Sequence, residues 1–243
     1  MPAANKSYIG KGIVYVANDD GILVDRGNVT AFSYTAEEET ISLPNFRNTS
    51  GGNYNSVSRL TAVNVSMTFS DFSADNYATG LRAGVTAVTS GVITDEAQTT
   101  PADVSKDFLL PTDNVIDITA AVTVTGYTEG TDFTKAGAGI VVLASGTIPA
   151  STALAITYTK KAVDSIQTFI NAAIDRRVVF DGLNEAQSDA PTVIEIHKFK
   201  PGLAEEAQFL GTEFGEIVLP GEALLDASIT GTGLSQYLQI KAA

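Results

Sequence analysis

The sequence predicts an all-β protein with one flanking α-helix. Apolar and polar residues alternate over several long runs, turn-forming Gly, Asn and Asp separate these runs, and a single segment has helical spacing. Between about residues 92 and 163 the composition changes to many Thr, Ala and Gly with few large side chains. We therefore predict one discontinuous β domain from residues 1–91 and 164–243, interrupted by a smaller β module at residues 92–163.

The N-terminal part begins with a predicted hairpin and continues into a long strand. Apolar runs at residues 13–17 and 22–24 flank a turn that ends in Asp20-Gly21, which is typical of a β-hairpin. Residues 29–43 then alternate as one extended strand. One face of this strand is expected to be polar: Ser33, Thr35, Glu37 and Glu39.

A second strand, predicted at residues 60–70, alternates more cleanly than any other segment. Its apolar side consists of Val63, Val65, Met67 and Phe69. Its polar side consists of Asn64, Ser66, Thr68 and Ser70. This pattern predicts one face on a core and the other on water. Neither polar face contains Lys or Arg, so the two faces are suited either to an aqueous channel or to an ordinary outer surface.

Between these strands lies a segment rich in Asn, Ser and Gly, residues 44–58, which we predict to be a long loop. Aromatic and Arg side chains in an exposed loop are typical of docking surfaces. The alternative is a plain flexible connection. The docking candidates in or beside the loop are Asn45, Phe46, Arg47, Asn48, Tyr54 and Arg59.

The one predicted helix follows the second long strand. Ser73 is suited to cap its N-terminus, and Gly84 is placed where a helix would stop. Helical spacing predicts a buried stripe made of Ala74, Tyr77, Ala78 and Leu81.

Further strands are predicted along the rest of the chain. In the middle module they span residues 115–125, 140–144 and 153–160, a pattern that resembles an immunoglobulin-like or related small β module. After it they span residues 166–170, 178–180, 192–199, 217–219 and 234–240.

The composition disfavours several classes of function. With 15 Lys and Arg against 28 Asp and Glu, the net charge of -13 repels nucleic-acid phosphates, although repulsion also suits a channel that must pass DNA without holding it. The alternative is that the charge serves solubility alone. No apolar run approaches the roughly 20 residues that cross a bilayer, so we predict no membrane insertion.

The residues for catalysis or cofactor binding are also scarce. The chain has no Cys, which excludes thiol nucleophiles and Cys-ligated metals, and its only histidine, His197, shares a strand face with Glu195. No nucleophile elbow, phosphate-binding glycine loop or metal-ligand pattern accompanies this pair. We predict neither an enzyme nor a cofactor or metal site.

Several segments, taken in order, resemble the major tail tube proteins of long-tailed bacteriophages. The N-terminal part contributes residues 10–16, followed by the two long strands and the polar segment between them. The C-terminal part contributes residues 179–185, 193–198, 211–216 and 219–222. The middle segments at residues 127–133 and 154–158 resemble an outward β module that such virion proteins carry.

This resemblance implies a tail-tube β-sandwich or barrel with one flanking helix and an inserted immunoglobulin-like module. Such subunits form hexameric rings that stack into the tail tube and conduct DNA into the host, contacting DNA only in non-specific transit. The polar strand faces would line the lumen, and residues 44–58 would contact the next ring. Other expected partners are the tape measure and tail-end proteins, and the expected location is the virion tail, assembled in the host bacterial cytoplasm.

The inserted module favours a non-contractile, siphovirus-like tail, because a sheath would crowd an outward decoration. Two alternatives stay open at this point. One is the tube protein of type VI secretion, which has the same general fold. The other is a bacterial surface adhesin or carbohydrate-binding β protein that binds through residues 92–163.

Overall fold

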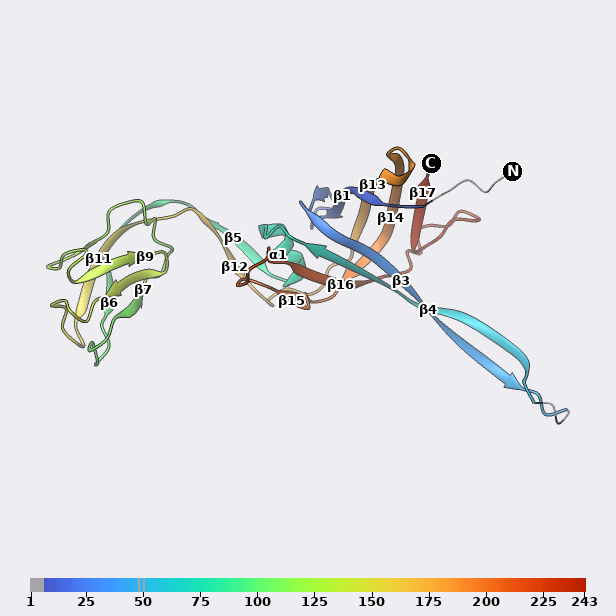
Figure 1. The fold of residues 1–243 in the computed structure, drawn as a ribbon, viewed down its shortest axis with the longest axis horizontal. Helices are drawn as coiled ribbons and strands as arrows, with labels where there is room; N and C mark the ends of the chain where they lie inside the picture. The colour runs from blue at the N-terminus through green and yellow to red at the C-terminus, as the bar shows by residue number, and fades with distance from the viewer. Residues whose placement is uncertain (1–6, 48, 50) are drawn as a thin grey trace. The chain divides into compact units, whose positions relative to one another are not determined.

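The computed structural model describes residues 7–47, 49 and 51–243. The described chain is mostly β with one α-helix and several antiparallel sheets, which confirms the predicted all-β class (Figure 1). It divides into two compact units: unit 1 comprises Met1–Gly84 and Ile166–Ala243, and unit 2 comprises Val85–Ser165. The first junction thus lies several residues before the predicted boundary at residues 91 and 92.

Unit 1 contains a nine-stranded antiparallel sheet in the order β2-β1-β13-β14-β16-β4-β3, with β15 beside β16 and β17 beside β14. Its strands are β1 (Gly10–Ala17), β2 (Leu23–Asp25), β3 (Val29–Pro44), β4 (Asn53–Phe69), β13 (Arg176–Asn184), β14 (Ala190–Pro201), β15 (Glu206–Ala207), β16 (Ile217–Ala223) and β17 (Leu238–Ala242). A short 3-10 helix, η1 (Glu185–Gln187), links β13 to β14. The predicted N-terminal hairpin is confirmed, since β1 pairs with β2.

One hydrophobic core holds this sheet together. The predicted apolar side of β4 is confirmed, because Val63, Val65, Met67 and Phe69 are all buried. Buried residues of β1, β13, β14 and β16 join the same cluster, so strands from both halves of the chain enclose a single core. Apolar burial of this kind supplies the main stabilisation of the unit.

The helix α1 (Ala74–Gly80) begins as predicted, because the Ser73 side chain accepts a hydrogen bond from the Asn76 backbone N–H. The predicted stripe of Ala74, Tyr77, Ala78 and Leu81 is only half-buried, and its Tyr77 packs against the core of unit 1. The buried residues are Asn76, Thr79 and Gly80, and the side chain of Asn76 donates to Arg26 O at 3.0 Å and to Asp71 O at 2.8 Å. These hydrogen bonds satisfy the amide N–H groups of Asn76, whereas its Oδ1 is buried without a hydrogen-bond partner among the described residues.

The predicted stop of the helix is also displaced. The C-cap is Leu81, and Arg82, rather than Gly84, has a positive φ of 49°. Gly84 instead begins β5 (Gly84–Val88), which pairs with β12 (Val163–Gln167) as a separate two-stranded sheet. The chain therefore leaves unit 1 and returns to it on two paired strands.

The predicted loop at residues 44–58 is too long at both ends. β3 continues to Pro44 and β4 begins at Asn53, so only residues 45–52 connect them. The pairing runs from Val29 opposite Phe69 to Pro44 opposite Asn53. Composition misled the prediction, because Asn and Ser have low strand propensity but are held extended here by their cross-strand partners.

Unit 2 has its own small sheets and its own core. Its strands are β6 (Gly91–Thr99), β7 (Phe108–Pro111), β8 (Thr123–Val124), β9 (Phe133–Ala136), β10 (Gly139–Val142) and β11 (Ala153–Lys160). The two three-stranded sheets are β7-β10-β9 and β6-β11-β8, and their buried side chains form one cluster separate from that of unit 1. The strand predicted at residues 153–160 is confirmed, whereas that at residues 115–125 is reduced to β8.

Two buried or half-buried polar networks fix the loops of unit 2. Asp132 accepts hydrogen bonds from Thr128 N at 2.8 Å and from Thr147 N at 2.7 Å, and these bonds lower its pKa. Tyr158 donates to Glu96 Oε2 at 2.6 Å, and burial raises the pKa of this Tyr. Every one of these groups has a structural partner, so neither network is left free to take part in chemistry.

The described helices include none that is long and apolar enough to cross a bilayer.

Candidate functional site

The structure brings together much of the predicted polar surface on β3 and β4. Ser33 pairs with Ser66 and Thr35 pairs with Asn64, so each pair shares one side of the sheet. These four residues line a shallow groove of about 280 Å³ together with Glu205, Pro220 and Gly221. The groove offers hydroxyls, an amide and a carboxylate, which are side chains without positive charge.

Glu37 extends this polar surface along β3. Its Oε1 accepts a hydrogen bond from Asn64 Nδ2 at 2.7 Å, which ties the carboxylate to the neighbouring strand. Thr68 pairs with Val218 and is half-buried. Ser70 lies beyond the end of β4, where its backbone N–H donates to Asn28 O at 2.9 Å. The polar surface therefore includes Asn64, Ser66 and Thr68 of β4. Ser70 was predicted to belong to it but lies outside the strand.

A β-bulge changes the outer part of the hairpin. Glu37 pairs with Ala62, but Glu38 pairs with Leu60, so Thr61 is the extra residue on β4. Glu39 consequently pairs with Arg59, which places a guanidinium beside the predicted acidic position. This surface is therefore not free of positive charge at its outer end.

Beyond the bulge, the face of the hairpin that is polar near the core carries apolar side chains, and the opposite face carries polar ones. Thr40 Oγ1 and Ser58 Oγ are hydrogen-bonded at 2.9 Å on one side of the ribbon. On the other side, which carries Glu37 and Ser33 nearer the core, Ile41 pairs with Val57 and both are about half exposed. Such exposed apolar pairs on a two-stranded ribbon lack the packing that usually stabilises a sheet.

The tip of the hairpin carries most of the predicted docking residues. Phe46 is 87% exposed and Arg47 is exposed beside it, while Tyr54 and Arg59 lie within β4 and are exposed. Asn45 accepts a hydrogen bond from Arg47 N through Oδ1 at 2.9 Å. The predicted residue Asn48 lies outside the described residues. Figure 1 shows β3 and β4 running on as a ribbon beyond the other strands of unit 1.

A second surface, which the sequence analysis did not select, lies between β14 and β16. The segment of residues 203–216, here named the acidic loop, contains four Glu and no Lys or Arg. Phe209, Leu210 and Phe214 in it are 70%, 91% and 94% exposed. Only Phe209 has ring contacts, with Phe72 and Tyr77. A run of Glu combined with large apolar residues and no basic residue was the available signal in the sequence.

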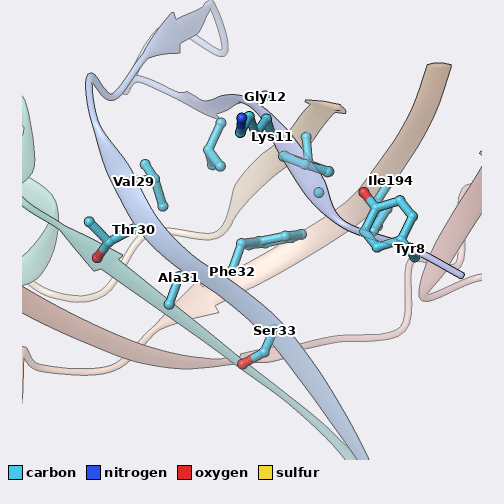
Figure 2. Close-up of a pocket in the computed structure, with 12 residues that line it drawn as sticks. Tyr8, Lys11, Gly12, Val29, Thr30, Ala31, Phe32, Ser33 and Ile194 are labelled. Carbon is cyan, nitrogen blue, oxygen red and sulfur yellow. The ribbon is translucent and has the colours of Figure 1, made fainter. Parts of the chain in front are cut away.

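One hollow near the free edges of the sheet lies between β1 and β3 (Figure 2). It measures about 360 Å³ and is lined by both apolar and polar residues, among them Phe32, Ile194 and Thr30. Phe32 stacks obliquely on Phe180 at a centroid distance of 5.6 Å. Its one amine, Lys11, lies 2.7 Å from Glu185 Oε2, and the hydrogen bond to Glu185 raises the pKa of Lys11. The lining thus offers a surface for packing rather than a set of reactive groups.

The only histidine is held in an ion-pair cluster on β13 and β14. His197 Nδ1 lies 3.7 Å from Glu195 Oε1, and Arg177 Nη2 lies 2.6 Å from the same oxygen. The prediction that His197 and Glu195 share a face agrees with this contact. Among the described residues, no group of three His, Asp or Glu side chains is arranged to hold a metal ion.

Two buried arginines of unit 1 are occupied within the fold. Arg26 Nη2 donates to Val16 O at 3.1 Å, and burial lowers the pKa of this Arg. Arg176 donates to Ala17 O at 2.8 Å and to Asp19 Oδ1 at 2.6 Å. These hydrogen bonds tie Arg26 and Arg176 to β1. Arg26 Nε and Nη1 and Arg176 Nε have no hydrogen-bond partner among the described residues, and both arginines line a pocket of about 210 Å³ that also contains Asp residues.

No curated protein matches the sequence. A family model described as protein of unknown function UCP028589 matches residues 7–241, and the chain therefore belongs to this family.

Proposed function

We propose that this protein is a structural subunit that assembles with copies of itself into a bacteriophage tail tube. The observation that carries the proposal is the β3–β4 hairpin, whose outer part exposes apolar side chains and two unpaired strand edges. Unpaired edges invite strand addition, and natural proteins cover or pair them. A neighbouring copy is the partner that covers the same surface in every subunit of a symmetric assembly.

The two ends of the main sheet support the same proposal. β3 is a terminal strand, and at the other end β2 covers only Tyr15–Ala17 of β1, leaving the part from Gly10 to Ile13 without a second strand neighbour among the described residues. Rings of copies would pair such edges around a closed circle, in the hexameric and stacked arrangement that the resemblance implies. Unit 2, with a core of its own, would be the outward module of a non-contractile tail.

Purified protein is expected to form rings or tubes as its concentration rises. Burial of exposed apolar side chains and pairing of strand edges favour association. Sedimentation velocity over a concentration series, followed by negative-stain microscopy, measures the assembly directly. A species that stays monomeric at every concentration and salt level would overturn the proposal and favour an isolated binding protein.

We further propose that the polar surface of Ser33, Thr35, Glu37, Asn64 and Ser66 lines the channel. Carboxylates, amides and hydroxyls do not trap phosphates, whereas each fixed cation on the wall attracts one. Glu39 and Thr68 extend this surface at its two ends. Glu39 lies directly opposite Arg59 on the neighbouring strand.

A Glu37→Lys change is expected to slow DNA ejection from assembled particles several-fold, most strongly at low ionic strength, where screening is weakest. The matched control is Glu38→Lys, because Glu38 lies on the opposite face of β3 and both carboxylates are exposed. Ejection is timed by dye-labelled DNA release at several salt concentrations. Equal ejection rates for both variants in normal tails would remove Glu37 from the channel wall.

A further inference from the structure

We infer that the outer hairpin of one copy docks on the acidic loop of the next copy, and that this contact stacks the subunits. The inference rests on the proposed tube function and adds the surface that receives the hairpin. The outer hairpin is defined here as residues 40–60, and the acidic loop is residues 203–216. Both surfaces belong to unit 1.

The charges of the two surfaces are complementary. In a chain of net charge -13, the outer hairpin contains Arg47 and Arg59 but no Asp or Glu, and Glu39 lies opposite Arg59 at its inner boundary, so Arg47 is the cation farthest from an acidic neighbour. The acidic loop contains Glu205, Glu206, Glu213 and Glu216 but no Lys or Arg. Oppositely charged patches steer partners together and fix their register, whereas two copies of either surface would repel.

The apolar side chains of the two surfaces also match. Phe46 at the hairpin tip is 87% exposed, and Phe214 in the acidic loop is 94% exposed. Leu43 and Leu210 add aliphatic side chains that are 54% and 91% exposed. Aromatic and aliphatic anchors within a charged rim are the usual composition of a protein–protein interface.

The register of β4 prevents these surfaces from meeting within one copy. Phe69 pairs with Ile217, the residue that follows the acidic loop, so the loop lies at the C-terminal end of β4. The hairpin tip begins where Asn53 pairs with Pro44, at the opposite end of the same strand. The 17 residues of β4 separate these ends by roughly 50 Å at about 3.3 Å per residue.

Surfaces at opposite ends of one rigid element give a head-to-tail contact. Such a heterologous contact leaves a free hairpin at one end of the dimer and a free acidic loop at the other. Further copies can therefore add at both ends, and the assembly grows instead of stopping at a pair. A second copy is therefore the occupant that explains both surfaces at once, and the direction of propagation follows β4.

Charge exchange tests the contact. Arg47→Glu alone and Glu213→Arg alone are each expected to raise the concentration needed for polymerisation by about tenfold or more, because each places like charges together. The double variant is expected to recover most of this loss. The matched control is Lys106→Glu, which makes the same change of charge on an exposed residue of unit 2 and is expected to polymerise normally.

Disulfide trapping tests the same contact without relying on charge. Because the chain has no Cys, the introduced thiols are the only ones in a mixture of Phe46→Cys and Phe214→Cys proteins, and oxidising each protein alone shows how much symmetric disulfide each one forms. A covalent dimer is expected from this mixture, since disulfides need Cα atoms within about 7 Å. A mixture of Phe46→Cys with Ile118→Cys, an exposed residue of unit 2, is expected to stay uncoupled.

The outcomes separate the two proposals. Polymers that form equally well from all charge variants, without a trapped dimer, would overturn the hairpin-to-loop contact and leave the tube function standing. Absence of polymers from the unmodified protein would overturn the tube function together with this contact. Recovery in the double variant, or a trapped dimer from the first mixture only, supports the contact.

Discussion

Shortening the β3–β4 hairpin is expected to abolish polymerisation while unit 1 stays folded. The variant replaces residues 38–61 by Asn-Gly, so that Glu37 and Ala62, which already face each other, flank a two-residue turn. The described side chains that are removed are exposed, apart from half-buried Asn45, so the core loses no buried apolar group. The change also removes the bulge at Thr61 and both arginines of the hairpin.

Sedimentation velocity measures the loss of polymers, and circular dichroism with thermal melting measures the fold. The matched control is the Thr40→Ala, Ser58→Ala double change, which keeps the full hairpin length and removes only one exposed hydrogen bond. It is expected to assemble. A shortened protein that still forms tubes would assign assembly to other surfaces, and one that loses its β signal would show that the hairpin stabilises unit 1.

A Phe199→Ala change is expected to destabilise unit 1 by about 3–5 kcal/mol. Phe199 is fully buried in the core of unit 1, and its ring covers Gly221 so closely that a Cβ there would collide with it. Removing the ring leaves a cavity that the paired strands β14 and β16 cannot easily close. The matched control is Phe169→Ala, since Phe169 is 65% exposed and outside the buried cluster.

Urea unfolding followed by near-ultraviolet circular dichroism measures this difference. Because the core of unit 2 shares no residue with that of unit 1, the unfolding of unit 2 is expected to keep its midpoint in the variant. A single transition that shifts as a whole would show that the two units unfold together. A shift no larger than that of the Phe169→Ala control would show that the cavity collapses.

Structural features that depend on the local sequence alone were predictable. The alternation from Val63 to Phe69 gives a buried face because period-two burial decides the register of a strand. Ser73 was predicted as a helix cap because its short side chain reaches the first free N–H groups. The division of composition near residue 92 likewise indicated a second unit, although not the residue at which it begins.

Features that depend on distant partners were not predictable. Residues 53–58 are strand because β3 lies beside them, although four of the six are Asn or Ser, which have low strand propensity. Asn76 is buried because carbonyls of Arg26 and Asp71 accept its amide hydrogens. The bulge at Thr61, which brings Arg59 opposite Glu39, has no sequence signal such as Gly, so the predicted acidic face included no cation.

The paired strands at the junction of the two units make the inserted module exchangeable. β5 and β12 are hydrogen-bonded neighbours, so the chain enters and leaves the module at points about 5 Å apart. Any guest domain with closely spaced termini can replace residues 89–162 without stretching the host strands. Unit 1 is therefore suited to display, because the inserted module can be exchanged while unit 1 keeps its own sequence.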